Sequence, residues 1–161
     1  MSSKNYQPTY SNTELLEFQN HHRLSWATKE KDLPNSVTKK HLNNFYNYLT
    51  TSLQIHHPVE LTLYGRGQLP HRVIGESVNH LSGIAHTERY ADGSMKSELH
   101  VAYKDRTLFS SMVTLAHEYR HSYQILVQNR WDDKEHDLEC DAIDYSYDVV
   151  TDYLKTQFLN E

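Results

Sequence analysis

Two histidines and a glutamate lie close together in the last third of the chain, in the string His117-Glu118-Tyr119-Arg120-His121. In a helix, residues i and i+4 lie one turn apart on the same face, so both imidazoles can reach one Zn²⁺ ion at about 2.0 to 2.1 Å. Glu118 lies roughly 100° around the helix, where its carboxylate can act on a metal-bound water instead of binding the ion. This HExxH spacing predicts a zinc site with His117 and His121 as ligands and Glu118 as general base.

The motif needs support from its surroundings, because histidine is common in this chain. With 12 histidines and 11 glutamates in 161 residues, chance alone gives about 0.06 occurrences of the string. The apolar residues of the same predicted helix form one continuous arc: Leu108, Phe109, Met112, Leu115, Ala116, Tyr119, Tyr123, Leu126 and Val127. The motif residues lie nearly opposite this arc, together with Ser110, Thr114 and Gln128. Helix geometry leaves two interpretations open, a solvated surface and a metal-bearing cleft.

A further carboxylate, Glu139, lies in the last predicted helix with apolar residues on both sides. These neighbours are Leu138, Ala142, Ile143, Tyr145, Val149, Val150, Tyr153 and Leu154. A buried, unpaired carboxylate costs several kcal/mol or shifts its pKa, and a zinc ion shared with two histidines removes that cost. The alternative is a buried salt bridge or a neutral, hydrogen-bonded acid. The aspartates of this helix fall on the opposite face and are interpreted as a solvated acidic surface: Asp137, Asp141, Asp144, Asp148 and Asp152.

His117-Glu118-x-x-His121 followed 18 residues later by Glu139-x-x-Ala142 resembles the gluzincin branch of zinc metallopeptidases, and among them the small ImmA/IrrE-like and minimal-gluzincin proteins. The resemblance covers about residues 83 to 153. It implies that His117, His121 and Glu139 bind one Zn²⁺ per chain and that Glu118 is the general base. Larger gluzincins often carry an acid four residues after the ligand glutamate, where this chain has Ile143. The outer partner of the histidines is therefore unassigned.

The fold class expected from the order of elements is α+β: a small antiparallel or mixed sheet of zincin-like type, packed on the HExxH helix and on a C-terminal helix that carries Glu139. Helical spacing predicts helices over about 13–27, 34–53, 107–128 and 133–158. Alternation predicts a strand at 59–63, and Asp92-Gly93 predicts a hairpin between strands at about 83–90 and 98–104. We expect residues 1–12 to be disordered and residues 13–161 to form one domain, with a helical extension at 13–57 and a catalytic core at 58–161.

Composition limits the class of protein. No run approaches the roughly 18 apolar residues of a membrane span, and a net charge of −5 argues against bulk attraction to nucleic acid or to an anionic membrane. The single cysteine, Cys140, cannot form an internal disulfide, which agrees with a reducing compartment. We therefore expect a cytoplasmic protein whose partner is a peptide or protein substrate, with a regulatory protein as one candidate. Oligomeric state is not readable from the sequence.

Three functional hypotheses follow. The leading one is a zinc metallopeptidase, and the second is a zinc-stabilised regulatory or binding module of ImmA/IrrE type with weak or no hydrolase activity. The third is a helical protein with no metal and a chance motif. Weaker candidates for stabilising an oxyanion, each with a plainer interpretation as a surface or core residue, are His86, Tyr90, His100, Tyr103, His136 and Tyr145.

Overall fold

The computed structural model describes residues 22–26, 36–65, 69, 82–103 and 107–159. Within these residues, four strands form one mixed sheet in the order β1-β2-β4-β3. They are β1 (His22–Trp26), β2 (Val59–Tyr64), β3 (Gly83–Arg89) and β4 (Met95–Ala102). Strands β1, β2 and β4 run parallel, and β3 pairs antiparallel with β4 at one end of the order. This arrangement confirms an α+β fold with a mixed sheet.

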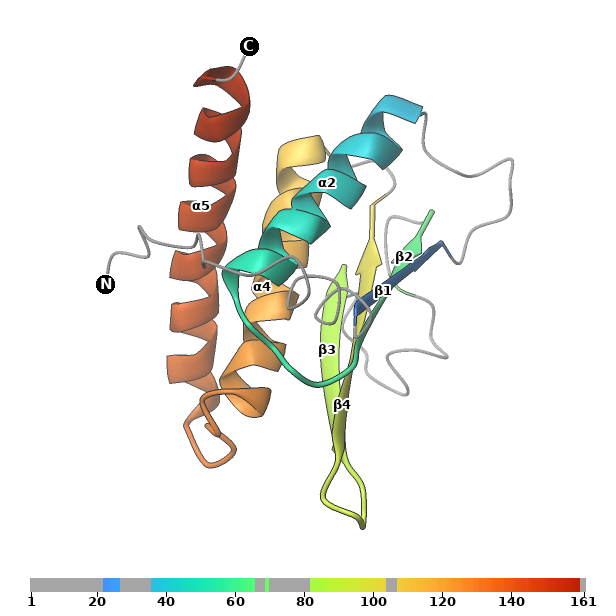
Figure 1. The fold of residues 1–161 in the computed structure, drawn as a ribbon. Helices are drawn as coiled ribbons and strands as arrows, with labels where there is room; N and C mark the ends of the chain where they lie inside the picture. The colour runs from blue at the N-terminus through green and yellow to red at the C-terminus, as the bar shows by residue number, and fades with distance from the viewer. Residues whose placement is uncertain (1–21, 27–35, 66–68, 70–81, 104–106, 160–161) are drawn as a thin grey trace.

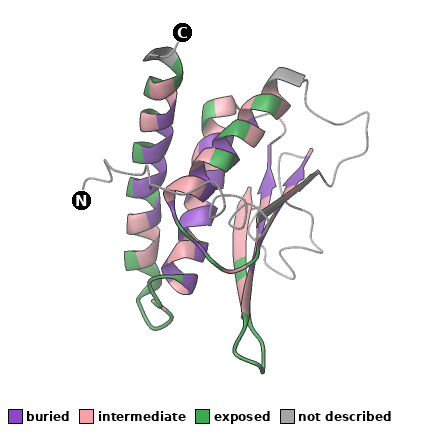
Figure 2. Cartoon of the chain, in the orientation of Figure 1, coloured by how far each residue is buried: buried purple, intermediate pink, exposed green. Residues whose placement is uncertain are grey.

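The helices of the described part of the chain lie on one side of this sheet (Figure 1): α2 (Ser36–Ser52), α4 (Leu108–Leu126) and α5 (Glu135–Leu159). Helix α4 packs on β3 and β4, and α5 packs along α4. The buried residues of α4 and α5 face inward, and exposed residues line the outer side of α5 (Figure 2). The two helices that carry the predicted ligands therefore lie against each other.

Local sequence explains most of these elements. In β2, Val59, Leu61 and Leu63 are buried and alternate with half-buried residues, as expected for a strand with one face toward the core. The Thr107 hydroxyl caps α4 by accepting a hydrogen bond from the Ser110 amide at 3.0 Å. Gly93, with φ of 89°, occupies the left-handed position of the hairpin turn, where glycine is favoured.

The main core fills the space between the sheet and the helices. Leu42, Phe45 and Leu49 of α2 meet Leu61 of β2 and Leu99 of β4 in one buried cluster. Helices α4 and α5 supply the remaining large buried side chains: Met112, Leu115, Tyr119, Tyr145, Val149, Val150 and Tyr153. This packing holds α4 in place on the sheet, and α4 carries the motif.

The first predicted helix, over 13–27, is wrong where the structure describes it. His22–Trp26 forms strand β1 and pairs with β2, with Leu24 opposite Leu61. The pairing places this segment in a parallel ladder, a long-range interaction that outweighs a local helical pattern. The helical extension predicted for residues 13–57 therefore contains a strand. The disorder predicted for residues 1–12 lies outside the described residues.

Three smaller predictions about faces are also wrong. Phe109 and Val127 of α4 and Ile143 of α5 belong to the predicted apolar arcs, yet each is exposed. Phe109 and Val127 lie near the two ends of α4, where less of the neighbouring structure covers the helix. Ile143 lies at the edge of the α4–α5 contact. The centre of the α4 arc, at Met112, Leu115 and Tyr119, is buried as expected. The α5 arc is buried at Ala142, Tyr145 and Val149 but not at Leu138 or Glu139.

Candidate metal centre

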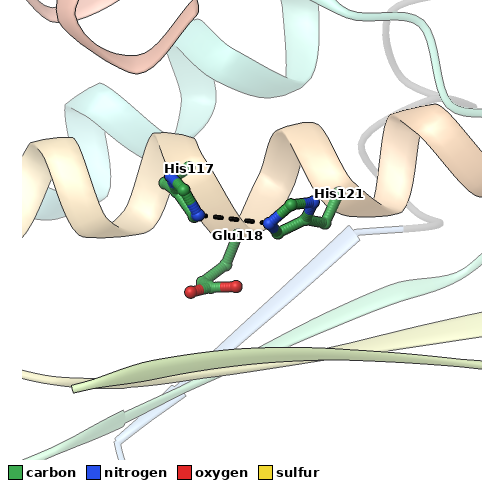
Figure 3. A group of neighbouring side chains, drawn as sticks. All are labelled: His117, Glu118 and His121. Atoms are coloured by element: carbon green, nitrogen blue, oxygen red, sulfur yellow. Dashed lines mark hydrogen bonds between the residues drawn. The ribbon is translucent and has the colours of Figure 1, made fainter. Parts of the chain in front are cut away.

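Helix α4 brings His117 and His121 together one turn apart, as the spacing predicts. Their Nε2 atoms are 3.1 Å apart, and the two rings meet edge to face with centroids 4.7 Å apart (Figure 3). Both side chains are largely buried. Burial and the neighbouring His121 lower the pKa of His117, so its neutral form, the form that binds a metal, is favoured.

Helix α5 brings Glu139 to the same point. One carboxylate oxygen lies 3.1 Å from His117 Nε2, and the other lies 2.7 Å from His121 Nε2. The Glu139 side chain is 43% exposed, so it lies at the margin of the helix contact and not at the buried centre predicted from the apolar arc. The predicted burial of Glu139 is therefore wrong. Ile143, one turn further along the same row of α5, is exposed as well.

Glu118 is buried although it lies on the polar side of the predicted helical wheel. Only 8% of the residue is exposed, and its side chain points away from the histidine pair toward the strands (Figure 3). Burial, followed by the charge of Glu139, raises the pKa of Glu118 to about 8. The alternative of an ordinary solvated face is therefore wrong for this residue, because the sheet edge covers it.

Strand β3 approaches α4 very closely at Gly83. A Cβ atom at this position would lie 2.7 Å from Thr114 Cγ2 and 2.8 Å from Glu118 Oε2, closer than real Cβ contacts. Only glycine lets the strand come this near to the carboxylate. No motif in the sequence marks Gly83, and only the packing of a distant strand on the helix reveals its role.

A cleft of about 630 Å³ opens at these residues. Its walls come from the start of β3, from α4 and from the first two turns of α5: Ser82, Gly83, Ile84, Ala85, Val113, Thr114, His117, Glu118, His121, Glu135 and Glu139. The cleft thus joins the edge of the sheet to all four predicted site residues.

The donor set fits a metal ion. His117, Glu118 and His121 each offer a ligand atom within 4.8 Å of the others, so this group could hold a metal ion. The Glu139 oxygens lie within 3.1 Å of the histidine nitrogens. Two ligands on a tetrahedral zinc ion lie about 3.3 Å apart. The Nε2 atom of His117 lies 3.1 Å from His121 Nε2 and 3.1 Å from Glu139, close to this value, and the 2.7 Å between His121 Nε2 and Glu139 is shorter.

Next to His121 lies a network of polar side chains that sequence reasoning missed: Gln124, Asp141 and Arg120. The Nδ1 atom of His121 lies 2.8 Å from Gln124 Oε1, and Gln124 Nε2 lies 2.7 Å from Asp141 Oδ2. Asp141 also accepts two hydrogen bonds from Arg120, at 2.9 and 3.1 Å. Asp141 is therefore not part of a solvated acidic surface. The i+3 spacing of Gln124 from His121 is the signal that could have pointed to this contact.

The weaker oxyanion candidates do not line the cleft. His86 and Tyr90 are exposed and bond Glu88, while His100 lies 2.8 Å from the Tyr64 hydroxyl through Nδ1. The remaining three are buried in the core or exposed: Tyr103, Tyr145 and His136. The plainer interpretation fits each of these six residues.

Comparisons of the chain with protein-family models, with curated proteins and with solved structures found no match. Among the residues that the structure describes, no helix combines the length and apolar character needed to cross a membrane.

Proposed function

We propose that the protein is a zinc-dependent peptidase of the gluzincin type, with a zincin-like fold similar to that of ImmA/IrrE-like and minimal-gluzincin proteins. One observation carries the proposal: His117 Nε2, His121 Nε2 and the Glu139 carboxylate converge beside the buried carboxylate of Glu118. Two imidazole nitrogens and a carboxylate that lie within 3.1 Å of one another can share one metal ion. Burial and the neighbouring His121 lower the pKa of His117, which favours the neutral form that binds a metal.

We assign His117, His121 and Glu139 as the ligands of one Zn²⁺ ion per chain. Two histidines and one carboxylate form the ligand set of catalytic zinc sites, which keep a fourth position for water or substrate. Zinc bound there supplies a Lewis acid that lowers the pKa of a water molecule to about 7 and polarises a substrate carbonyl.

Glu118 is the general base in this proposal. Its carboxylate takes a proton from the attacking water and then gives a proton to the leaving amine of the cleaved peptide bond. Burial gives Glu118 a pKa near the working range of an acid and base, at about 8, and a nearby cation would favour its charged form. The close approach of Gly83 fixes the side of the cleft on which Glu118 lies.

The substrate that suits this cleft is an extended peptide or protein segment. Among the strands that the structure describes, β3 has a hydrogen-bonded neighbour, β4, on one side only, and its first residues line the cleft. An extended chain can pair with such an edge through backbone hydrogen bonds. A regulatory protein is one candidate substrate, as the resemblance implies. We expect the activity in the cytoplasm, in agreement with the single cysteine.

The test is the isosteric variant Glu118→Gln. It should keep one zinc per chain and a wild-type melting temperature, but cleave a peptide library about 10² to 10⁴ times more slowly, because only the general base is removed. Asp137→Asn is the matched control, since it makes the same acid-to-amide change at an exposed position on α5 outside the cleft.

Cleavage products should be identified by mass spectrometry, with candidate repressor proteins as additional substrates. Equal cleavage by wild type and Glu118→Gln would contradict the mechanism. Zinc binding without cleavage by either protein would instead favour the regulatory module.

A further inference from the structure

We propose that Gln124 is a positioning residue that fixes the ring of His121 and, at the same time, the place of Glu139 on α5. This inference rests on the proposed zinc site and adds an outer group of residues to it. A continuous chain of polar contacts runs from His121 through Gln124 and Asp141 to Arg120.

The network itself determines how the Gln124 amide is oriented. Its nitrogen faces two acceptors, the Leu138 carbonyl oxygen at 2.9 Å and Asp141 Oδ2 at 2.7 Å. Neither of these atoms can donate a hydrogen bond, so the –NH₂ group must point toward them. The amide oxygen therefore points toward His121, where it lies 2.8 Å from Nδ1.

This orientation selects one form of the His121 ring. An amide oxygen only accepts hydrogen bonds, so Nδ1 must carry the hydrogen. In the neutral ring the lone pair then belongs to Nε2, the atom beside His117 and Glu139. Gln124 thus presents Nε2 of His121 as a ligand before any metal binds, which lowers the cost of forming the site.

The same amide holds α5 on both sides of Glu139. Leu138 immediately precedes Glu139 and Asp141 follows two residues later, and Gln124 bonds both. The contacts of Gln124 thereby fix Glu139 of α5 relative to His121 of α4. Because Gln124 is fully buried, water does not compete for these bonds.

Arg120 anchors the far end of the network. Its guanidinium makes a two-point contact with Asp141, at 2.9 and 3.1 Å, and lies between the rings of Tyr123 and Tyr145 at 4.9 and 4.8 Å. Paired, planar contacts of this kind restrict the carboxylate to one orientation. Asp141 thus keeps the –NH₂ group of Gln124 turned away from His121.

The first test replaces Gln124 with methionine, which has a similar length and no hydrogen-bonding amide. Zinc affinity, measured by competition with a chromophoric chelator, should fall about 10- to 100-fold. The second readout is the nitrogen-15 chemical shifts of the His121 ring in the metal-free protein, recorded at a pH high enough for the ring to be neutral. The wild type should show hydrogen on Nδ1, and Gln124→Met should show a mixture of both ring forms.

Ser122→Ala is the matched control for loss of stability. Ser122 is a buried polar residue of the same helix and bonds Ser97 of β4 instead of His121. Its variant should melt at a lower temperature but bind zinc with wild-type affinity and keep the wild-type ring form. An affinity loss in Ser122→Ala as large as that in Gln124→Met would assign the effect to general destabilisation and overturn the proposal.

The two proposals can fail separately. If the wild type binds no zinc, the proposed function is wrong, and the ring form of His121 in wild type and Gln124→Met still decides the role of Gln124. If the wild type binds zinc but carries the His121 hydrogen on Nε2 in the metal-free state, the positioning proposal is wrong and the zinc site remains.

Discussion

Glu118 and Glu139 have the same chemical group but very different surroundings. Glu118 is buried against strand β3, whereas the Glu139 side chain is 43% exposed and faces two imidazole nitrogens. A buried carboxylate with a raised pKa suits proton transfer, and a carboxylate at the edge of a nitrogen pair suits metal binding. Each role therefore follows from the environment of the residue.

At the residue scale, we predict that Glu139→Ala lowers zinc affinity by more than about 100-fold, because losing even an outer partner of a ligand costs about 10- to 100-fold. Metal content per chain after dialysis is the measurement. Asp137→Ala should retain the metal, since Asp137 is exposed and does not line the cleft. If Asp137→Ala empties the site and Glu139→Ala does not, the ligand assignment on α5 is wrong.

Strand β3 and helix α4 act together at the element scale. The strand lies so near the helix that Gly83 leaves no room for a Cβ atom beside Thr114 and Glu118. The edge of the sheet therefore buries the candidate base and forms one wall of the cleft. Neither element alone creates these surroundings.

We predict that Gly83→Ala lowers the cleavage rate by about 100-fold while zinc stays bound. The new methyl group must displace Glu118 or the strand, and misplacing a catalytic group by about 1 Å can cost this much. Steady-state rates and metal content would check this prediction. His86→Ala, on the same strand but exposed and outside the cleft, should cleave at the wild-type rate. A fully active Gly83→Ala protein would contradict the role given to this close approach.

A second prediction at this scale concerns His100 of strand β4 and the dependence of stability on pH. Burial lowers the pKa of His100, partly offset by Glu98, so the native state favours the neutral ring. The unfolded chain then binds more protons, and the free energy of unfolding should fall as the pH drops below the unfolded pKa of about 6.5. His100→Gln, which keeps an acceptor for the Tyr64 hydroxyl, should show a weaker dependence on pH in urea unfolding between about pH 7.5 and 5. If the free energy of unfolding depends on pH as strongly in His100→Gln as in the wild type, groups other than His100 control this dependence.

For the whole molecule, the candidate metal site matters because it lies outside the main core, between the last two helices. The main core lies between the sheet and the helices, while the candidate ligands line a cleft formed by α4, the start of α5 and the start of β3. A metal bound there joins α4 to α5 next to the contacts of Arg120 with Asp141. Zinc should therefore stabilise the packing of the last two helices.

We predict that removing zinc with a chelator lowers the melting temperature. At free zinc 100-fold above its dissociation constant, binding to the native state alone contributes about 2.7 kcal/mol. For a chain of this size, that corresponds to about 5 to 10 °C. Calorimetry with and without chelator is the measurement, and a His117→Ala/His121→Ala variant should melt at the same temperature in both. A wild type that is insensitive to the chelator would contradict structural coupling to the metal.

Sequence alone determined the features that depend on local geometry. The i, i+4 spacing places His117 and His121 on one face of any helix, and the structure has their Nε2 atoms 3.1 Å apart. The alternation of β2 and the Asp92-Gly93 turn likewise depend on neighbouring residues only. The predicted contact of Glu139 with this pair also agrees with the structure, although its buried setting does not.

Tertiary structure alone decided what covers each face. Helical periodicity tells which residues share a face, but not whether a strand or water lies against it, so the burial of Glu118 under Gly83 was not predictable. The pairing of Asp141 with Arg120 and Gln124 depends on the relative register of two helices. Strand β1 forms because β2 offers a parallel partner far along the chain. These features require long-range contacts, and a local pattern does not encode them.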